Sequence, residues 1–183
     1  MLVGNALVSY SANVEMTIVG PEVMRPNGAG SLTEWASNLG DNWQSVNDAT
    51  PDDDASYVYS TSLLVNQTDY YQIQNNAVGF GTITNVTVWM RCRASDVLSG
   101  FAPPVQLMLK TGSTEYNGSI VNLTTTYANY SQSYTVNPQT SQAWTWSELD
   151  ELEVGIRGNA IQVESSTANP YCTQIWVEVN YHP

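Results

Sequence analysis

The side chains best placed for chemistry in this chain form an acidic group in "ELDELE", from Glu148 to Glu153. Two carboxylates about 5–5.5 Å apart on either side of a glycosidic bond can hydrolyse it by a retaining double displacement. Other catalytic groups are scarce, because the one histidine, His182, lies next to the C-terminal proline, where chain ends usually fray. The sequence has no G-x-S-x-G, H-E-x-x-H or Walker motif, so neither a serine hydrolase nor a histidine zinc site is indicated.

The spacing E-x-D-x-x-E in this segment resembles the motif of jelly-roll β-glucanases, the laminarinase-like glycosidases. The resemblance implies that Glu148 is the nucleophile, Asp150 its helper and Glu153 the acid and base. The preceding "TWSE" is typical of a helix start, and on a helix Glu148 and Glu153 would point about 140° apart. We therefore interpret the acids as the N-terminus of a short helix, where the helix dipole favours them, and expect no enzyme.

A second acidic group, in "TPDDDASY", offers oxygen ligands for a hard cation. Calcium takes six to eight oxygens, often from acidic loops, and Asp48 lies near this group in the sequence. The spacing matches no EF-hand loop, so a solvated acidic turn before the next strand is the plainer interpretation. Calcium held by Asp52, Asp53 and Asp54 stays an alternative, and no other cofactor is expected.

Aromatic side chains are abundant, with six Trp and eleven Tyr against two Phe. Exposed Trp and Tyr rings can stack on sugars, as in carbohydrate-binding modules, which makes surface glycans a possible partner. The Trp residues are scattered along the chain, however, and a sandwich core and its rims can absorb all of them. Whether Trp89 and Trp176 lie exposed in a concave row or buried distinguishes the two interpretations.

The two cysteines both fall in expected strands. Cys92 continues the apolar face of "NVTVWMRC", whereas Cys172 lies opposite the apolar face of "YCTQIWVEVNY". Simple alternation therefore predicts two separate thiols, because a disulfide needs neighbouring Cβ atoms. A β-bulge would bring them together, so a Cys92–Cys172 disulfide stays an alternative.

Five N-x-[ST] sequons mark candidate sites of N-glycosylation. They begin at Asn66, Asn85, Asn117, Asn122 and Asn129. In a chain that crosses a secretory pathway these residues are acceptors, and five glycans would give one small domain a polar coat. A cell of origin without this modification would leave them bare.

These residues must be held mainly by β-strands, because β-branched and aromatic runs recur between short turn sequences. The runs cover residues 55–64, 69–75, 81–94, 104–112, 124–137, 152–158 and 172–181. This pattern is typical of an all-β fold, a jelly-roll-like antiparallel β-sandwich. Thr145 and Glu148 have the spacing of a capping box, which predicts one short helix.

The longest alternating stretch is "NALVSYSANVEMTIV", residues 5–19. One face of this strand carries Ala6, Val8, Tyr10, Ala12, Val14, Met16 and Ile18. Ordering about 15 residues costs about 15–30 kcal/mol, and burying the larger side chains returns at most about 8–15 kcal/mol, so the strand must join a sheet edge. The following "GPEVMRPNGAGSLTEW" has a linker composition. We therefore divide the chain into an arm and hinge (1–24) and a sandwich domain (25–183).

Two sheet edges could accept this arm, one in its own sandwich and one in a neighbouring copy. We favour the neighbour, because the arm is longer than one sandwich usually needs and precedes a Pro/Gly-rich hinge. Such donor-strand exchange between identical subunits propagates into a filament. The main prediction is thus a structural subunit that forms a homopolymer, and sugar binding and glycoside hydrolysis are the alternatives.

Three segments, "RPNGAGSLTEW" (25–35), "AWTWSELDELEVGIR" (143–157) and "TQIWVEVNY" (173–181), together resemble a known group of domains. This is a widespread group of small all-β structural domains in bacteriophage and microbial surface or filament proteins. The resemblance implies a jelly-roll-like sandwich and a structural role, and it gives no site residues.

The charge composition limits the partners. The chain has 5 Lys and Arg against 17 Asp and Glu, a formal charge of −12, whereas nucleic acids and anionic membranes bind clustered cations. No run of 18 apolar residues occurs, so we expect no membrane insertion, and no signal peptide is visible. A surface of hydroxyls and amides suits an extracellular or virion-surface protein.

Overall fold

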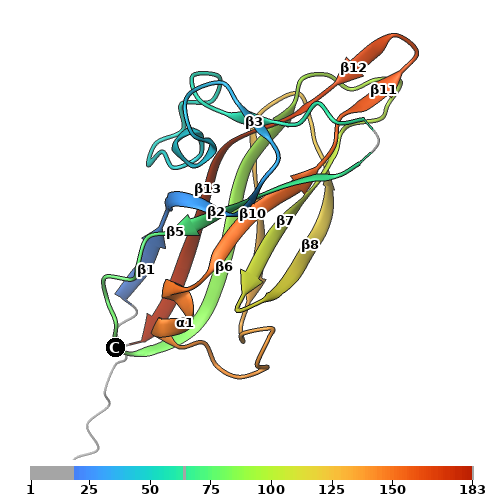
Figure 1. Ribbon diagram of the computed structural model, residues 1–183. Helices are drawn as coiled ribbons and strands as arrows, with labels where there is room; N and C mark the ends of the chain where they lie inside the picture. Colours follow the sequence, from blue (N-terminus) through green and yellow to red (C-terminus); the bar gives the residue numbers. More distant parts are fainter. Residues whose placement is uncertain (1–18, 64, 183) are drawn as a thin grey trace, which may run out of the picture.

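The computed structural model describes residues 19–63 and 65–182, and they form two packed antiparallel β-sheets (Figure 1). The six-stranded sheet has the order β3-β4-β13-β6-β9, and β1 also pairs with β13. Its strands are β1 (Val19–Met24), β3 (Ala36–Ser37), β4 (Val58–Tyr59), β6 (Thr82–Ala94), β9 (Ala128–Tyr134) and β13 (Pro170–His182). The predicted all-β sandwich is confirmed.

The five-stranded sheet has the order β2-β5-β10-β7-β8. Its strands are β2 (Pro26–Thr33), β5 (Gln67–Ile73), β7 (Pro104–Thr111), β8 (Thr114–Asn122) and β10 (Glu153–Gly158). A hairpin of β11 (Ile161–Val163) and β12 (Ser166–Ala168) extends from one end of the sandwich, and α1 (Trp146–Asp150) lies at the other (Figure 1). A 3-10 helix, η1 (Asn42–Ser45), precedes β4.

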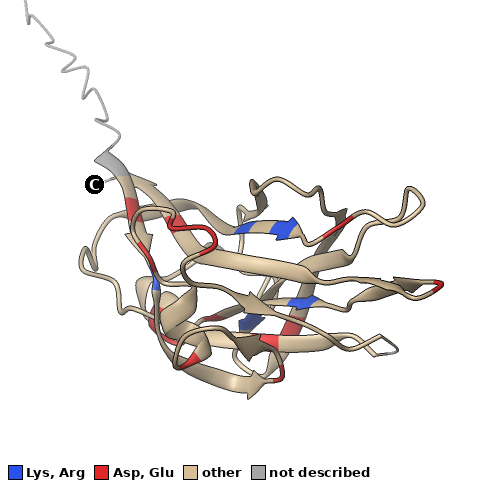
Figure 2. Ribbon diagram, turned by 90° about the horizontal axis from the view of Figure 1, so that it is seen from above, with Lys and Arg blue, Asp and Glu red and all other residues tan. Residues whose placement is uncertain are grey.

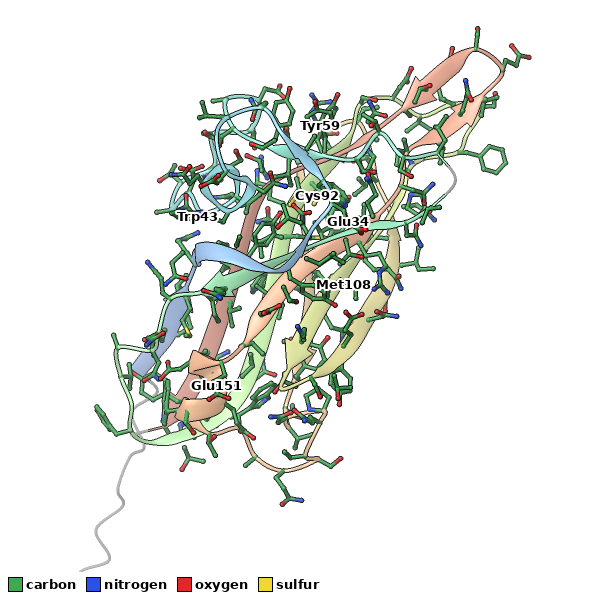
Figure 3. The ribbon with its side chains drawn as sticks, viewed as in Figure 1. Glu34, Trp43, Tyr59, Cys92, Met108 and Glu151 are labelled. Carbon is green, nitrogen blue, oxygen red and sulfur yellow. The ribbon has the colours of Figure 1, made fainter. Side chains whose placement is uncertain are left out.

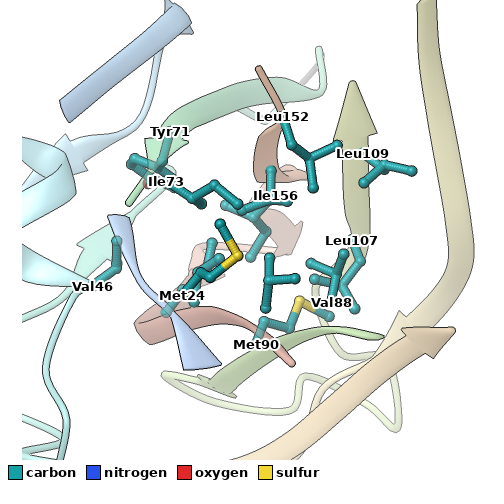
Figure 4. Close-up of a cluster of buried hydrophobic side chains, with 14 of the residues drawn as sticks. Met24, Val46, Tyr71, Ile73, Val88, Met90, Leu107, Leu109, Leu152 and Ile156 are labelled. Carbon is teal, nitrogen blue, oxygen red and sulfur yellow. The ribbon is translucent and has the colours of Figure 1, made fainter. Parts of the chain in front are cut away.

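The core lies between the two sheets, where alternate residues of each strand point inward. Val88 and Met90 of β6 lie in the same buried cluster as Leu107 of β7 and Ile156 of β10 (Figure 4). These side chains are at most 4% exposed. The long central strands β6 and β13 pair from Thr82 to Ala94, so their outward residues are held on a rigid surface.

The segment interpreted as a hinge is part of the sandwich. Its first half is β1, which pairs with β13 from Val19↔Tyr181 to Met24↔Val177, and its second half is β2. The glycines serve close packing there: a Cβ on Gly30 would lie 2.5 Å from the carbonyl carbon of Tyr70. Composition alone therefore misidentified a strand as a linker, and the expected assembly residues Ala6 to Ile18 lie outside the described part of the chain.

The predicted short helix is present as α1, with Thr145 as its N-cap residue. The Glu148 carboxylate accepts a hydrogen bond from the Thr145 backbone N–H at 2.8 Å, and Thr145 Oγ1 accepts one from Glu148 N–H at 3.3 Å. Of the helices in residues 19–63 and 65–182, none has the length and hydropathy to cross a bilayer.

Candidate functional site

The outer face of the six-stranded sheet carries two tryptophans side by side. Trp89 of β6 and Trp176 of β13 are directly opposed in the antiparallel register. Their rings are parallel within 3°, with centroids 5.5 Å apart, and both side chains are partly exposed. They belong neither to the core nor to a row of fully exposed rings, and each covers one side of the other.

Trp176 also lines a surface pocket of about 260 Å³. The pocket is lined by Val23, Arg25, Ala49, Pro51, Asn129, Gln174, Trp176 and Glu178. It therefore combines an aromatic wall with amide, carboxylate and guanidinium groups, the composition that orients a polar ligand with an apolar face.

Hydrogen bonds fix the polar walls of this pocket. The backbone carbonyl of Asp48 accepts from the Arg25 guanidinium at 2.6 Å and from the Gln174 amide at 2.7 Å. The indole N–H of Trp176 donates to a Glu178 carboxylate oxygen at 3.1 Å. Asn129 reaches the pocket from β9, where its side-chain oxygen accepts from Arg91 at 3.3 Å. These bonds hold the walls in place before any ligand arrives.

Aromatic and cationic groups continue along the same face beyond the tryptophans. The Arg93 guanidinium lies 4.8 Å from the ring centroid of Tyr171 and 5.1 Å from that of Tyr127. Tyr57 and Tyr171 meet edge to face at 4.9 Å. Sequence patterns do not single out these tyrosines, because only the fold shows that they lie on the same face as the tryptophans.

The Asp-rich turn supplies ion-pair partners for this face. Asp53 pairs with Arg91 at 2.7 Å, and Asp54 pairs with Arg93 at 2.8 Å. The hydrogen bond from Arg93 lowers the pKa of Asp54, and the hydrogen bond to Asp53 raises the pKa of Arg91, so both pairs stay charged at neutral pH. Figure 2 shows most of the basic residues on the strands of the sandwich, with Arg25 between β1 and β2, whereas acidic residues also occupy loops and the tip of the β11–β12 hairpin.

The three aspartates of the calcium alternative have separate partners in the structure. Asp53 and Asp54 bind arginines, while Asp52 accepts hydrogen bonds from Ser56 at 2.9 Å and from Thr173 at 3.1 Å. Within residues 19–63 and 65–182, no group of three or more His, Cys, Asp or Glu side chains is arranged to hold a metal.

The acids of "ELDELE" have separate partners. Glu148 is occupied by its capping bonds to Thr145, as described above. Glu153 lies on β10, where it accepts hydrogen bonds from the Ser31 hydroxyl at 2.6 Å and from Lys110 at 3.4 Å. The helix that we inferred from "TWSE" therefore removes Glu148 from the arrangement that the glycosidase alternative needs.

The outer face of the five-stranded sheet is closed by its own side chains. Tyr70 and Met108 are on this face, yet both are 0% exposed. Lys110 lies 5.7 Å above the Tyr70 ring, and the ion pair between Arg157 and Glu115 spans β10 and β8 at 3.1 Å. This face offers a ligand less aromatic surface than the Trp89–Trp176 face.

The two cysteines face each other, contrary to the prediction from alternation. Cys92 and Cys172 are directly opposed on β6 and β13, both are 0% exposed, and both thiols are free. A bulge between Cys172 and Gln174 inserts an extra residue and turns Cys172 inward. Figure 3 shows Cys92 between the two layers.

Four of the five sequon asparagines are exposed: Asn66, Asn117, Asn122 and Asn129. Asn85 is half-buried, and its side-chain nitrogen donates to the Thr87 hydroxyl of its own sequon at 2.7 Å. Glycosylation of these residues stays a prediction, with Asn85 the least accessible acceptor.

Comparison with known proteins finds remote structural neighbours. No protein-family model matches the chain, and no curated protein matches its sequence. A solved structure described as "CBM4 structure and function" shares 16% sequence identity, with a TM-score of 0.36, over 68% of this chain and 70% of that one. The N-terminal cellulose-binding domain of β-1,4-glucanase C from Cellulomonas fimi shares 16% identity, with a TM-score of 0.34, over 70% of this chain and 76% of that one.

These neighbours contradict the main prediction from the sequence. One is described as a cellulose-binding domain and the other as CBM4, and neither description mentions a bacteriophage or a filament. The predicted homopolymer and its donor-strand exchange are therefore corrected, and the virion location finds no support in these neighbours. The β-sandwich part of the resemblance is retained.

Proposed function

We propose that the chain is a carbohydrate-binding module that uses the outer face of the six-stranded sheet. The observation that carries the proposal is the Trp89–Trp176 pair beside a polar pocket of about 260 Å³. The apolar face of a sugar ring packs on an indole, and its hydroxyls need donors and acceptors at the ring edge. The neighbour from Cellulomonas fimi is described as a cellulose-binding domain, which agrees with this class of ligand without identifying it.

The arrangement favours one sugar unit held against Trp176. Trp89 covers one side of the Trp176 ring, and Trp176 lines the pocket whereas Trp89 does not. Asn129 and Glu178 then lie within the same hollow as hydrogen-bonding partners for hydroxyl groups. We infer that a hollow of about 260 Å³ accepts a single sugar ring, which favours a chain end or a side branch over a flat polymer surface.

The ligand is a neutral sugar in this proposal. The chain carries a net charge of −12, which repels polyanionic glycans at ordinary ionic strength. An extracellular location follows from such a ligand, and the low content of charged residues, 12%, agrees with it.

Isothermal titration calorimetry and tryptophan fluorescence test the proposal with neutral gluco-, xylo- and manno-oligosaccharides, and with uronic acid oligomers as matched acidic ligands. Trp176→Ala should weaken the binding of the recognised sugar at least about tenfold, which is about 1.4 kcal/mol. Phe101→Ala is the control, because Phe101 is 68% exposed in a different hollow, lined by Val97 and Leu123.

Two outcomes would overturn the proposal. One is a Trp176→Ala variant, folded by near-ultraviolet circular dichroism, that binds as tightly as the wild type. The other is the absence of binding to every soluble oligosaccharide and to the corresponding insoluble polysaccharides. If Phe101→Ala abolishes binding instead, the site lies in the other hollow and our assignment is wrong.

A further inference from the structure

The cysteine pair is independent of the proposed sugar site and has no assigned role. Cys92 and Cys172 are opposed residues of neighbouring antiparallel strands, and both face the core. Opposed residues in such strands have Cβ atoms about 4.5–5.5 Å apart, and disulfides have Cβ separations of about 3.5–4.5 Å. A small approach of the strands therefore brings the two sulfurs to bonding distance.

The surroundings of the thiols make them slow to react once the chain has folded. Burial, followed by the hydrogen bond with Cys172, raises the pKa of the Cys92 thiol well above its ordinary value. The Cys172 thiol in turn lies 3.4 Å from the backbone carbonyl oxygen of Gln174. Among residues 19–63 and 65–182 no metal-holding group of side chains includes either cysteine, and a buried thiol reacts slowly with solutes.

We propose that Cys92 and Cys172 form a cross-strand disulfide when the chain folds in an oxidising environment. The two thiols lose two electrons and two protons, an S–S bond forms, and a small disulfide oxidant such as oxidised glutathione becomes two thiols. The reaction proceeds by attack of one thiolate on the oxidant and displacement of glutathione by the second cysteine.

Burial determines when this bond can form. Both sulfurs are 0% exposed in the folded chain, so the oxidant reaches them before the sheets pack. The same burial then protects the bond from reductants. The bond would connect β6 to β13 across an 80-residue separation (172 − 92 = 80), and these strands also carry the Trp89–Trp176 pair.

Oxidative refolding tests the inference on the whole chain. The denatured protein is refolded with a mixture of reduced and oxidised glutathione, or with dithiothreitol, and then measured by intact mass and by alkylation after denaturation. The oxidised sample should be 2 Da lighter and take up no alkylating agent. Its thermal midpoint should lie about 5–15 °C above that of the reduced sample.

Variants separate the disulfide from other effects of the oxidant. The double variant Cys92→Ala, Cys172→Ala should melt at the same temperature after both refolding conditions. Wild-type protein that refolds with glutathione and still alkylates at both cysteines overturns the proposal, and so does a stable glutathione adduct or an intermolecular bond on a non-reducing gel. None of these outcomes depends on sugar binding.

Discussion

Replacement of Asp69 by asparagine tests how the buried part of the fold is held together. Asp69 is 0% exposed, and its two carboxylate oxygens accept four hydrogen bonds. The donors are the backbone N–H groups of Glu34 at 2.6 Å and Trp35 at 2.7 Å, the Asn42 amide at 2.5 Å and the Tyr71 hydroxyl at 3.0 Å. The carboxylate thus fixes β5 to the loop that follows β2.

Asparagine has one acceptor oxygen, so its NH₂ group would face two of these four donors. The Tyr71 hydroxyl can rotate and accept, but the other donor at that oxygen loses its partner. Each hydrogen bond to a charged group contributes about 1.5–3 kcal/mol, and relief of the buried charge offsets part of the loss. We expect Asp69→Asn to lower the free energy of unfolding by about 2–4 kcal/mol, which lowers the thermal midpoint by about 4–15 °C.

Urea denaturation followed by tryptophan fluorescence measures this change. Glu151→Gln is the matched control: it also removes one carboxylate, but from an exposed position at the end of α1, and should change stability by less than about 0.5 kcal/mol. Equal stabilities for the two variants would refute the reasoning.

The stability difference between the wild type and Asp69→Asn should also depend on pH, in a direction that the pKa of Asp69 determines. Burial raises the pKa of Asp69 above its ordinary value. A raised pKa in the folded state gives stability that is present below the unfolded pKa and is lost as pH rises through the folded value. Asp69→Asn lacks this contribution. The difference in the free energy of unfolding between the wild type and Asp69→Asn should therefore be largest in acid and decrease as pH increases. A difference in unfolding free energy that increases with pH would contradict the prediction.

Three further changes test other parts of the structure. Tyr70→Phe removes a buried hydroxyl that has no hydrogen-bond partner among the described residues, so thermal melting should show unchanged or slightly higher stability, by up to about 1 kcal/mol. Gly155→Ala should abolish soluble folded protein or cost more than about 3 kcal/mol, because its Cβ would run into the Asp69 carbonyl oxygen of β5; soluble yield and urea titration measure this. Expression in a yeast secretory host should place a glycan on exposed Asn129 and block the adjoining pocket, and Ser131→Ala, which removes the sequon but keeps Asn129, should restore sugar binding.

Strand alternation predicts the centre of the sandwich well, because one face of β6 and β13 is buried in the core and the other is partly exposed. It missed β8, whose sequence "TEYNGSIVN" has exposed residues on both faces and therefore no clear period of two. Composition, in turn, misjudged β1 and β2, because prolines and glycines are typical of linkers. Gly30 is needed for close packing against Tyr70, and no local pattern distinguishes that requirement from flexibility.

The candidate site was only partly visible in the sequence. Trp89 and Trp176 are separated by 86 other residues, and only the pairing of β6 with β13 places their rings 5.5 Å apart. The Asp-rich turn was recognised as acidic, but its partners Arg91 and Arg93 are distant in sequence. The tryptophan pair and the Asp–Arg ion pairs therefore both depend on contacts between distant parts of the chain, which residue spacing alone does not reveal.

One extra residue in β13 determines how both the Cys92–Cys172 pair and the Trp89–Trp176 pair are oriented. Without the bulge between Cys172 and Gln174, an inward Cys172 would place Trp176 on the inner face as well, because residues four apart in a regular strand share a face. With the bulge, Cys172 opposes Cys92 in the core while Trp176 opposes Trp89 at the surface. Thr173 holds the bulge in place, since its hydroxyl bonds to Asp52 at 3.1 Å and to the Ser56 carbonyl at 2.9 Å. The same irregularity thus creates the buried thiol pair and presents Trp176 to the pocket.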